Sequence, residues 1–200
     1  MTPISPTPRR TLDPRTKAFL AYLQKNPALR GRIRAAPNRS VAYAGQFPDG
    51  AAWERLLRRQ LTDPGTNDFQ MLPDVLRAIP CPADLYTAIG VVTPPGVRTL
   101  LDYVNFLTGE RPNPPYQGVP WNDDGFIIWR ALSGIFMSNA VGRVRLMIGD
   151  APRPETKVFY RTEVFVLDRN PNIDVFATGA VQQLRSQMST GIVKGTVELM

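Results

Sequence analysis

The chain has 200 residues, of which 43% are apolar, and this is enough to bury the core of one domain. It has no histidine and a single cysteine, Cys81, so Ser-His-Asp triads, Cys-His triads and an internal disulfide are excluded, and zinc sites are disfavoured. The net charge of +7 favours an anionic partner: nucleic acid, a nucleotide phosphate or an acidic protein.

The first residues of the sequence do not resemble a cleaved signal peptide. Two arginines near the start are not followed by an apolar run, so we expect no cleaved signal peptide and no membrane association. A single cysteine suits a reducing compartment. These features predict a cytosolic site of action, and any export route would have to work without a cleaved signal.

The first half of the chain predicts mainly helices. Asp13 followed by Pro14 favours a helix start, because the side chain can cap a turn that proline begins, and the helix extends to about Lys25. Residues 40–47 predict a short strand and residues 50–61 an amphipathic helix. A broken helix or loop is expected at 69–79. The proline-rich stretch from 80 to 120 leaves room for one further helix, at 97–109.

The second half changes character after its first element. Residues 123–142 predict a helix that starts at Asp123 or Asp124 and stops at Gly142. Four strands are then expected, at 143–149, 157–167, 173–179 and 190–199. A flexible proline-rich segment (1–12) would therefore precede one α/β (α+β) domain over 13–200, in which a helical N-terminal part packs on a C-terminal sheet of about four strands.

Glu163 is the residue that fits least well in this prediction. It lies between two phenylalanines in the predicted strand 157–167, where an unpaired buried carboxylate costs several kcal/mol. One explanation is structural, because Arg161 is on the same face of such a strand and can pair with it. The other is functional: the carboxylate projects from the end of the strand into a cleft.

Two aromatic residues are candidates for the wall of a pocket. Trp129 and Ser133 are four residues apart in the predicted helix and so share one face. Tyr43 precedes a small Ala-Gly pair at the end of the first strand, where a ligand could approach the backbone. A tryptophan in the core and an ordinary turn after the strand are the competing interpretations.

The order of these residues resembles the ADP-ribosyl cyclase / NAD glycohydrolase family, and in particular its bacterial polymorphic-toxin branch. The resemblance rests on "WRALSGIF" from residue 129, on Gly142-x-Val144, and on Glu163 shortly before Leu167. It covers about 60 residues well, and "VAYAGQF" is similar to the family's first aromatic strand. Leu72 stands where the family has a second glutamate, and the family's animal enzymes are rich in disulfides whereas this chain has none.

The resemblance implies an ADP-ribosyl cyclase-like fold with a mainly parallel sheet, and an enzyme that cleaves the nicotinamide–ribose bond of NAD⁺ or NADP⁺. It implies Glu163 as the catalytic carboxylate and no metal or cofactor beyond the NAD⁺ substrate. The residues expected to bind the substrate are Tyr43, Phe159, Arg130, Trp129, Ser133, Arg161 and Asp74. The product is left open between ADP-ribose, cyclic ADP-ribose and ADP-ribosyl transfer.

Other functions compete with this one. A NAD-depleting toxin or effector needs an immunity protein, and an acidic one would complement the charge of +7. A basic nucleic-acid-binding or structural α/β module without catalysis is the alternative from another class. Nucleic acid is the less favoured partner, because the arginines are scattered along the sequence without interleaved aromatic residues. A family member with a decayed site would bind NAD⁺ and leave it intact.

Overall fold

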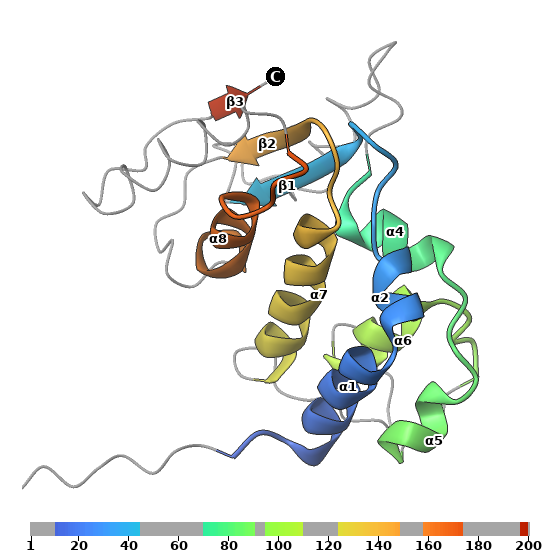
Figure 1. Cartoon of the computed structure of the whole chain (residues 1–200). Helices are drawn as coiled ribbons and strands as arrows, with labels where there is room; N and C mark the ends of the chain where they lie inside the picture. The colour runs from blue at the N-terminus through green and yellow to red at the C-terminus, as the bar shows by residue number, and fades with distance from the viewer. Residues whose placement is uncertain are drawn as a thin grey trace, which may run out of the picture.

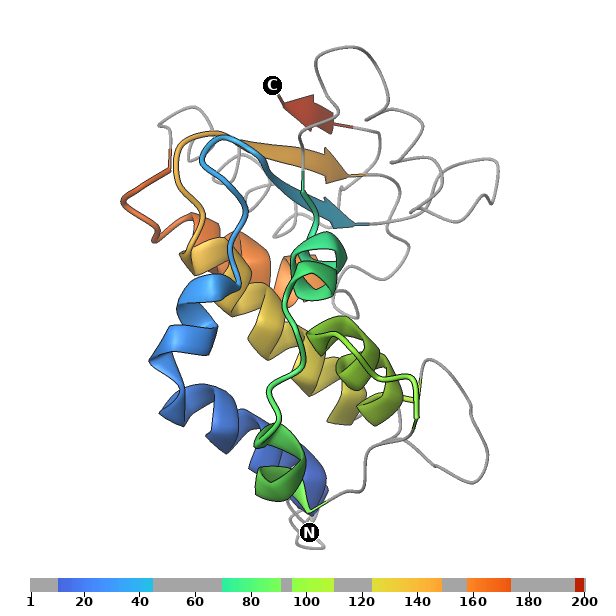
Figure 2. The same cartoon turned by 90° about the vertical axis from the view of Figure 1, so that its right-hand side faces the viewer.

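Helices dominate the structure, a computed structural model that describes residues 11–44, 70–90, 95–109, 124–148, 158–173 and 197–199. A small sheet lies at one end, and the described helices lie on one side of it (Figure 1). The central helix α7 (Phe126–Ser138) has α1 and α2 on one side and α4 and α6 on the other (Figure 2).

The sheet combines the two halves of the chain. Strand β1 (Ser40–Ala44) runs parallel to β2 (Val144–Ile148), and β3 (Val197–Leu199) pairs with β2 in the antiparallel direction, which gives the order β1-β2-β3. Gln70 extends the pairing beside β1, because its N–H donates to Arg39 O at 2.8 Å and its carbonyl accepts from Val41 N at 3.1 Å. The predicted strands at 40–47 and 143–149 are therefore confirmed in their described parts.

The first helix begins where the sequence predicts. Helix α1 (Pro14–Lys25) has Asp13 at its N-cap, where the carboxylate accepts a hydrogen bond from Arg15 N at 2.8 Å. Helix α2 (Pro27–Arg32) follows directly. The N-cap position of α7 is taken by Gly125 and not by the predicted Asp123 or Asp124; Asp124 accepts from Asp13 N at 2.6 Å and so joins the start of α1 to the start of α7.

Three shorter helices fill the middle of the chain. They are α4 (Leu72–Ala78), α5 (Leu85–Ile89) and α6 (Leu100–Leu107). Pro73 is tolerated in the first turn of α4, because the backbone N–H that proline lacks has no helical partner there. Thr99 and Asp102 form a capping box at the start of α6, inside the predicted range 97–109.

The predicted fold class is wrong. Residues 157–167 do not form a strand: the π-helix η3 (Phe159–Glu163) leads directly into the α-helix α8 (Val164–Leu167). In the described part of the chain the sheet has three strands of mixed direction instead of about four mainly parallel ones, and helices predominate. A helical part packed on an ADP-ribosyl cyclase-like parallel sheet therefore does not describe this protein.

The burial pattern explains this error. The buried residues of the segment are spaced by four, one and three positions: Phe159, Glu163, Val164 and Leu167. This spacing is helical, whereas a strand would bury every second residue. Because almost every position from 158 to 167 is apolar or β-branched, both periods fit the sequence, and tertiary packing decided between them.

Some expected elements lie outside the described residues. They are the helix at 50–61, most of the strands at 173–179 and 190–199, and most of the N-terminal segment 1–12. Ile173 itself forms a parallel bridge with Gly142.

One hydrophobic core holds the described elements together. It contains side chains from α1 near the N-terminus through to Ile173, and its largest fully buried members include Tyr103, Phe19, Phe136 and Phe159. Within the described ranges no helix combines the length and apolar character needed to cross a membrane.

Candidate functional site

Glu163 is buried at the contact between η3 and its neighbours. Its residue is 7% exposed, and η3 contacts both α7 and β1. One carboxylate oxygen, Oε2, has no hydrogen-bond partner in the structure. Burial raises the pKa of Glu163 to about 7, and a hydrogen bond with Ser133 opposes this rise. The result is an isolated acid that changes its charge near neutral pH.

Ser133 reaches Glu163 because of its position on α7. Apolar residues surround it on that helix, and it is 5% exposed. Trp129 precedes it by four residues and therefore lies one turn away on the same side of α7, also buried. The helix thus presents a hydroxyl and a large ring next to one another, on the side where Glu163 approaches.

A second polar contact fixes η3 against α7. Arg130 Nε donates a hydrogen bond to Thr162 Oγ1 at 2.8 Å, and the guanidinium lies 5.8 Å from the centre of the Phe126 ring. Gly134 faces Thr162 across the same contact: a Cβ at this position would stand 3.4 Å from the methyl group of Thr162, which is an ordinary van der Waals distance. These contacts hold the residue next to Glu163 and thereby limit where its carboxylate can lie.

The structure separates Arg161 from Glu163. The arginine is exposed while the glutamate is buried, since residues two apart in a helix point in different directions. The ion pair considered for these two residues depended on the strand, and it is absent here. Phe159, by contrast, lies on the buried side of η3, where it is 2% exposed and belongs to the core.

Two other predicted residues have different surroundings. Asp74 takes part in the N-terminal cap of α4: its carboxylate accepts from Met71 N at 3.2 Å and forms an ion pair with Arg77, also at 3.2 Å. Tyr43 lies in β1, opposite Met147, and its side chain is outside the described part. The η3–α7 contact thus brings together Arg130, Thr162, Ser133 and Glu163, and Trp129 lies one turn from Ser133 on α7.

Sequence analysis missed Thr162 and the π-helix. The π-helix has no signal in the sequence, although such short segments occur often at functional sites. Thr162 joins the site only through the helical register that places it beside Arg130, so a strand prediction could not find it.

The site offers one carboxylic acid with a hydroxyl and an indole ring nearby. In the described residues no group of three histidine, cysteine, aspartate or glutamate side chains is arranged to hold a metal ion. The chemistry that these groups can supply is stabilisation of a positive charge by the carboxylate, or proton transfer near neutral pH.

Comparison with known protein families, with curated proteins and with solved structures gives no match to this chain.

Proposed function

We propose that the protein is a NAD⁺ glycohydrolase that uses Glu163 to cleave the bond between nicotinamide and ribose. The observation that carries the proposal is the buried carboxyl group of Glu163, which has a free oxygen, a hydrogen bond with Ser133 and a pKa of about 7. An acid held in this way costs stability, and carboxyl groups with strongly raised pKa values cluster at functional sites.

The reaction suits a protein without histidine. When the C1′–N bond breaks, its electron pair goes to the nicotinamide nitrogen, so the leaving group departs neutral and needs no general acid. The ribosyl group becomes oxocarbenium-like, and water then captures it and loses a proton. A carboxylate beside that cation is worth several kcal/mol in a site without water.

The neighbours of Glu163 support the same chemistry. A nicotinamide ring carries a positive charge before it leaves, and stacking on Trp129 would contribute about 0.5–2 kcal/mol by cation–π attraction. The approach of this cation would also favour ionisation of Glu163. Because both side chains are almost fully buried, substrate entry requires that η3 and its neighbours separate. The π-helix η3 lies at this contact, and short π-helical segments occur often at functional sites.

The proposal includes the biological role of a NAD-depleting toxin or effector that acts in the cytosol, with an acidic immunity protein as its partner. The net charge of +7 supports an acidic partner, because opposite charges favour association. Leu72 is buried at the start of α4, so no second carboxylate stands at that position. The product of the reaction therefore has to be identified directly.

Nicotinamide release from NAD⁺ by the purified full chain tests the proposal. We expect turnover by the wild type and a loss of at least 100-fold in Glu163→Gln, which keeps the shape and removes the negative charge. Asp84→Asn is the matched control, since it makes the same change at a residue that accepts from Tyr22 on the other side of the helical part. Chromatography of the products separates ADP-ribose from cyclic ADP-ribose.

Absence of nicotinamide release by the folded wild type would overturn the proposal. Equal activity of the wild type and Glu163→Gln would overturn the role of Glu163. The same reaction with NADP⁺ measures which dinucleotide is preferred.

A further inference from the structure

Three segments that are far apart in the sequence, two of which start in the last turn of a helix, join at one corner of the molecule. They are residues 30–39, 138–143 and 168–173, which we call the basic corner. Asn139 Nδ2 donates to the carbonyls of Arg30 and Ile33 at 2.7 and 3.1 Å, and Asn38 N donates to Val141 O at 2.9 Å. Gly142 N donates to Asn172 O at 2.8 Å and so attaches the third segment.

The basic corner concentrates positive charge. Its three segments carry six arginines and one acidic residue, Asp168, whereas the whole chain has a net charge of +7. All six arginine side chains are exposed: Arg30, Arg32, Arg34, Arg39, Arg143 and Arg169. In the part of the chain that the structure describes, no ion pair involves Arg30, Arg32, Arg34 or Arg169. The arginine groups that look scattered along the sequence are therefore gathered by the fold.

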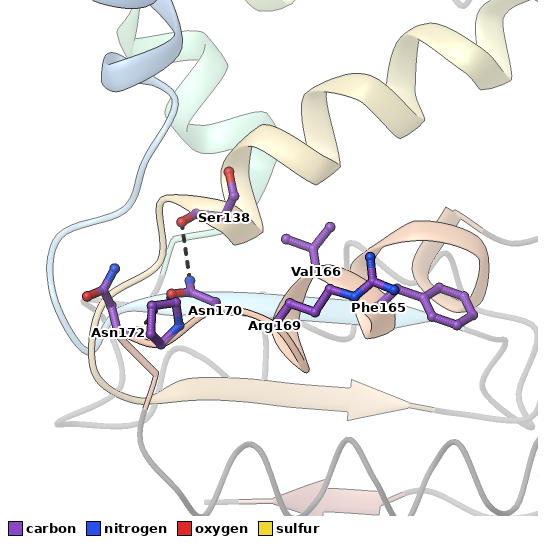
Figure 3. A pocket seen from close by; sticks show the side chains of 7 residues that line it. Ser138, Phe165, Val166, Arg169, Asn170 and Asn172 are labelled. Atoms are coloured by element: carbon purple, nitrogen blue, oxygen red, sulfur yellow. Dashed lines mark hydrogen bonds between the residues drawn. The ribbon is translucent and has the colours of Figure 1, made fainter.

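A pocket of about 290 Å³ opens beside this charge. Figure 3 shows it between the end of α7 and the helix α8, lined by Ser138, Phe165, Val166, Arg169, Asn170, Pro171 and Asn172. Most of the lining surface is apolar, although four of the seven lining residues have polar side chains: Ser138, Arg169, Asn170 and Asn172. Phe165 is 40% exposed, which is unusual for a phenylalanine in this structure. The volume is near the lower limit for ligand pockets, a size that suits one flat ring.

We propose that the basic corner binds single-stranded nucleic acid, with its phosphates on the exposed arginines and one base in the pocket against Phe165. Single-strand binding surfaces combine a positively charged path for the backbone with aromatic side chains on which bases stack. An acidic protein would also match the charge, but carboxylate side chains have no flat ring to fill an apolar pocket. Glu163 does not line the pocket, and it is buried whereas Phe165 is exposed on α8.

Fluorescence anisotropy with labelled 12-mers of oligo(U) and oligo(dT) tests the charge. The variant Arg32→Ala/Arg34→Ala should bind at least fivefold more weakly. The slope of log binding constant against log salt concentration should also be smaller in magnitude by about 1.4, because each phosphate contact on a single strand contributes about 0.7. The control Lys17→Ala/Arg98→Ala removes the same charge from exposed positions outside the corner, and its affinity should stay within twofold of the wild type. Equal losses in the two variants would overturn the assignment to this corner.

Phe165 variants test the pocket. Phe165→Leu keeps an apolar side chain but removes the ring, so it should weaken binding by at least fivefold, and Phe165→Trp should restore it. Circular dichroism checks that each variant is folded. Unchanged affinity in a folded Phe165→Leu would overturn base stacking.

Two further measurements separate the possible partners and activities. The first measures how well poly-glutamate displaces the labelled oligonucleotide. If it competes as strongly as unlabelled oligo(U), the surface binds acidic proteins instead, and the proposal is overturned. Glu163→Gln should bind the oligonucleotide as the wild type does, so failure of the NAD⁺ reaction and failure of nucleic-acid binding are distinguishable.

Discussion

Glu163 keeps its carboxyl group in surroundings that favour its neutral form. Apolar neighbours remove water, and one hydrogen bond with Ser133 returns only part of the lost solvation. The pKa of about 7 is the balance of these two effects. At neutral pH the acid is thus poised between its charged and neutral forms, and both its reactivity and its contribution to stability depend on pH.

Replacing Glu163 by glutamine should stabilise the protein in a pH-dependent way. Between the ordinary pKa of 4.5 and the folded value of about 7, the folded state binds a proton that the unfolded state has lost. The contribution of Glu163 to the free energy of unfolding therefore falls as the pH rises through this window and is constant above it. Urea unfolding should show Glu163→Gln more stable by up to about 3 kcal/mol at pH 8, and by much less at pH 5.

If the free energies of unfolding of the wild type and Glu163→Gln differ by the same amount at pH 5 and pH 8, the raised pKa is not that of Glu163. The control Asp84→Asn neutralises an exposed, hydrogen-bonded carboxylate and leaves Glu163 in place, so its difference in free energy of unfolding from the wild type should not grow in this way between pH 5 and pH 8.

The rate of NAD⁺ cleavage should follow the ionisation of the same carboxyl group. Only the charged form stabilises the ribosyl cation, so kcat/KM should rise with pH, with a midpoint near 7, and then level off. Ser133→Ala removes the hydrogen bond that lowers the pKa of Glu163, so the midpoint should move upward, while Ser133→Thr should largely restore it. A midpoint that does not move in a folded Ser133→Ala would argue against Ser133 as a positioning residue.

At the scale of single elements, the segment 158–167 shows where sequence reasoning fails. Its β-branched and aromatic residues favour a strand, yet it forms η3 and α8. Sequence reasoning could predict helix α1 and the strands at 40–44 and 144–148, because the capping residues, turn residues and hydrophobic period of each segment all indicate the same element. Where almost every position is apolar or β-branched, the hydrophobic period fits a helix and a strand alike, and the contacts with α7 and β1 decide.

Asn170 joins the end of α7 and the turn after it to residues 168–173 of the basic corner, and its removal should destabilise the protein. Its Nδ2 donates to the carbonyls of Met137, Ser138 and Ala140 at 2.9, 3.3 and 2.9 Å, and its Oδ1 accepts from Asn172 N at 2.9 Å. Asn170→Ala should lower the free energy of unfolding by about 2–3 kcal/mol, because carbonyls that it satisfies lose their donor.

Asn170→Asp should cost more than Asn170→Ala in the same urea experiment at pH 7, since it turns a carboxylate oxygen towards those carbonyls. Asn172→Ala, at an exposed neighbouring position, is the control and should change stability by less than about 1 kcal/mol. If Asn172→Ala lowers the free energy of unfolding as much as Asn170→Ala does, the stabilisation comes from the loop as a whole and not from the Asn170 side chain.

At the scale of the whole molecule, one core connects the first described helix to the last. Leu23 of α1 and Leu167 of α8 are both 2% exposed and belong to the same hydrophobic cluster. The hydrogen bond from Asp13 N to Asp124 adds a polar link between α1 and the start of α7. The described elements should therefore unfold together and not as separate parts.

Shortening a buried side chain in the first or in the last described helix should destabilise the protein in one and the same unfolding transition. Leu23→Ala and Leu167→Ala should each lower the free energy of unfolding by about 2–5 kcal/mol, because each leaves a cavity. Urea unfolding followed by tryptophan fluorescence and by circular dichroism should give coincident curves for both variants. Separate transitions in the two signals would contradict a single cooperative core.

The sequence by itself determined the charge, the absence of histidine chemistry, the start of α1 and the pairing of Trp129 with Ser133 on one helix face. These features depend on composition or on residues within one or two turns of each other, where local geometry is sufficient. Only the tertiary structure decided that 158–167 is helical, that Arg161 points away from Glu163, and that distant arginines share one corner. Those outcomes depend on which surfaces are buried against each other. Contacts between segments over 100 residues apart cannot be predicted from the local sequence pattern of either segment.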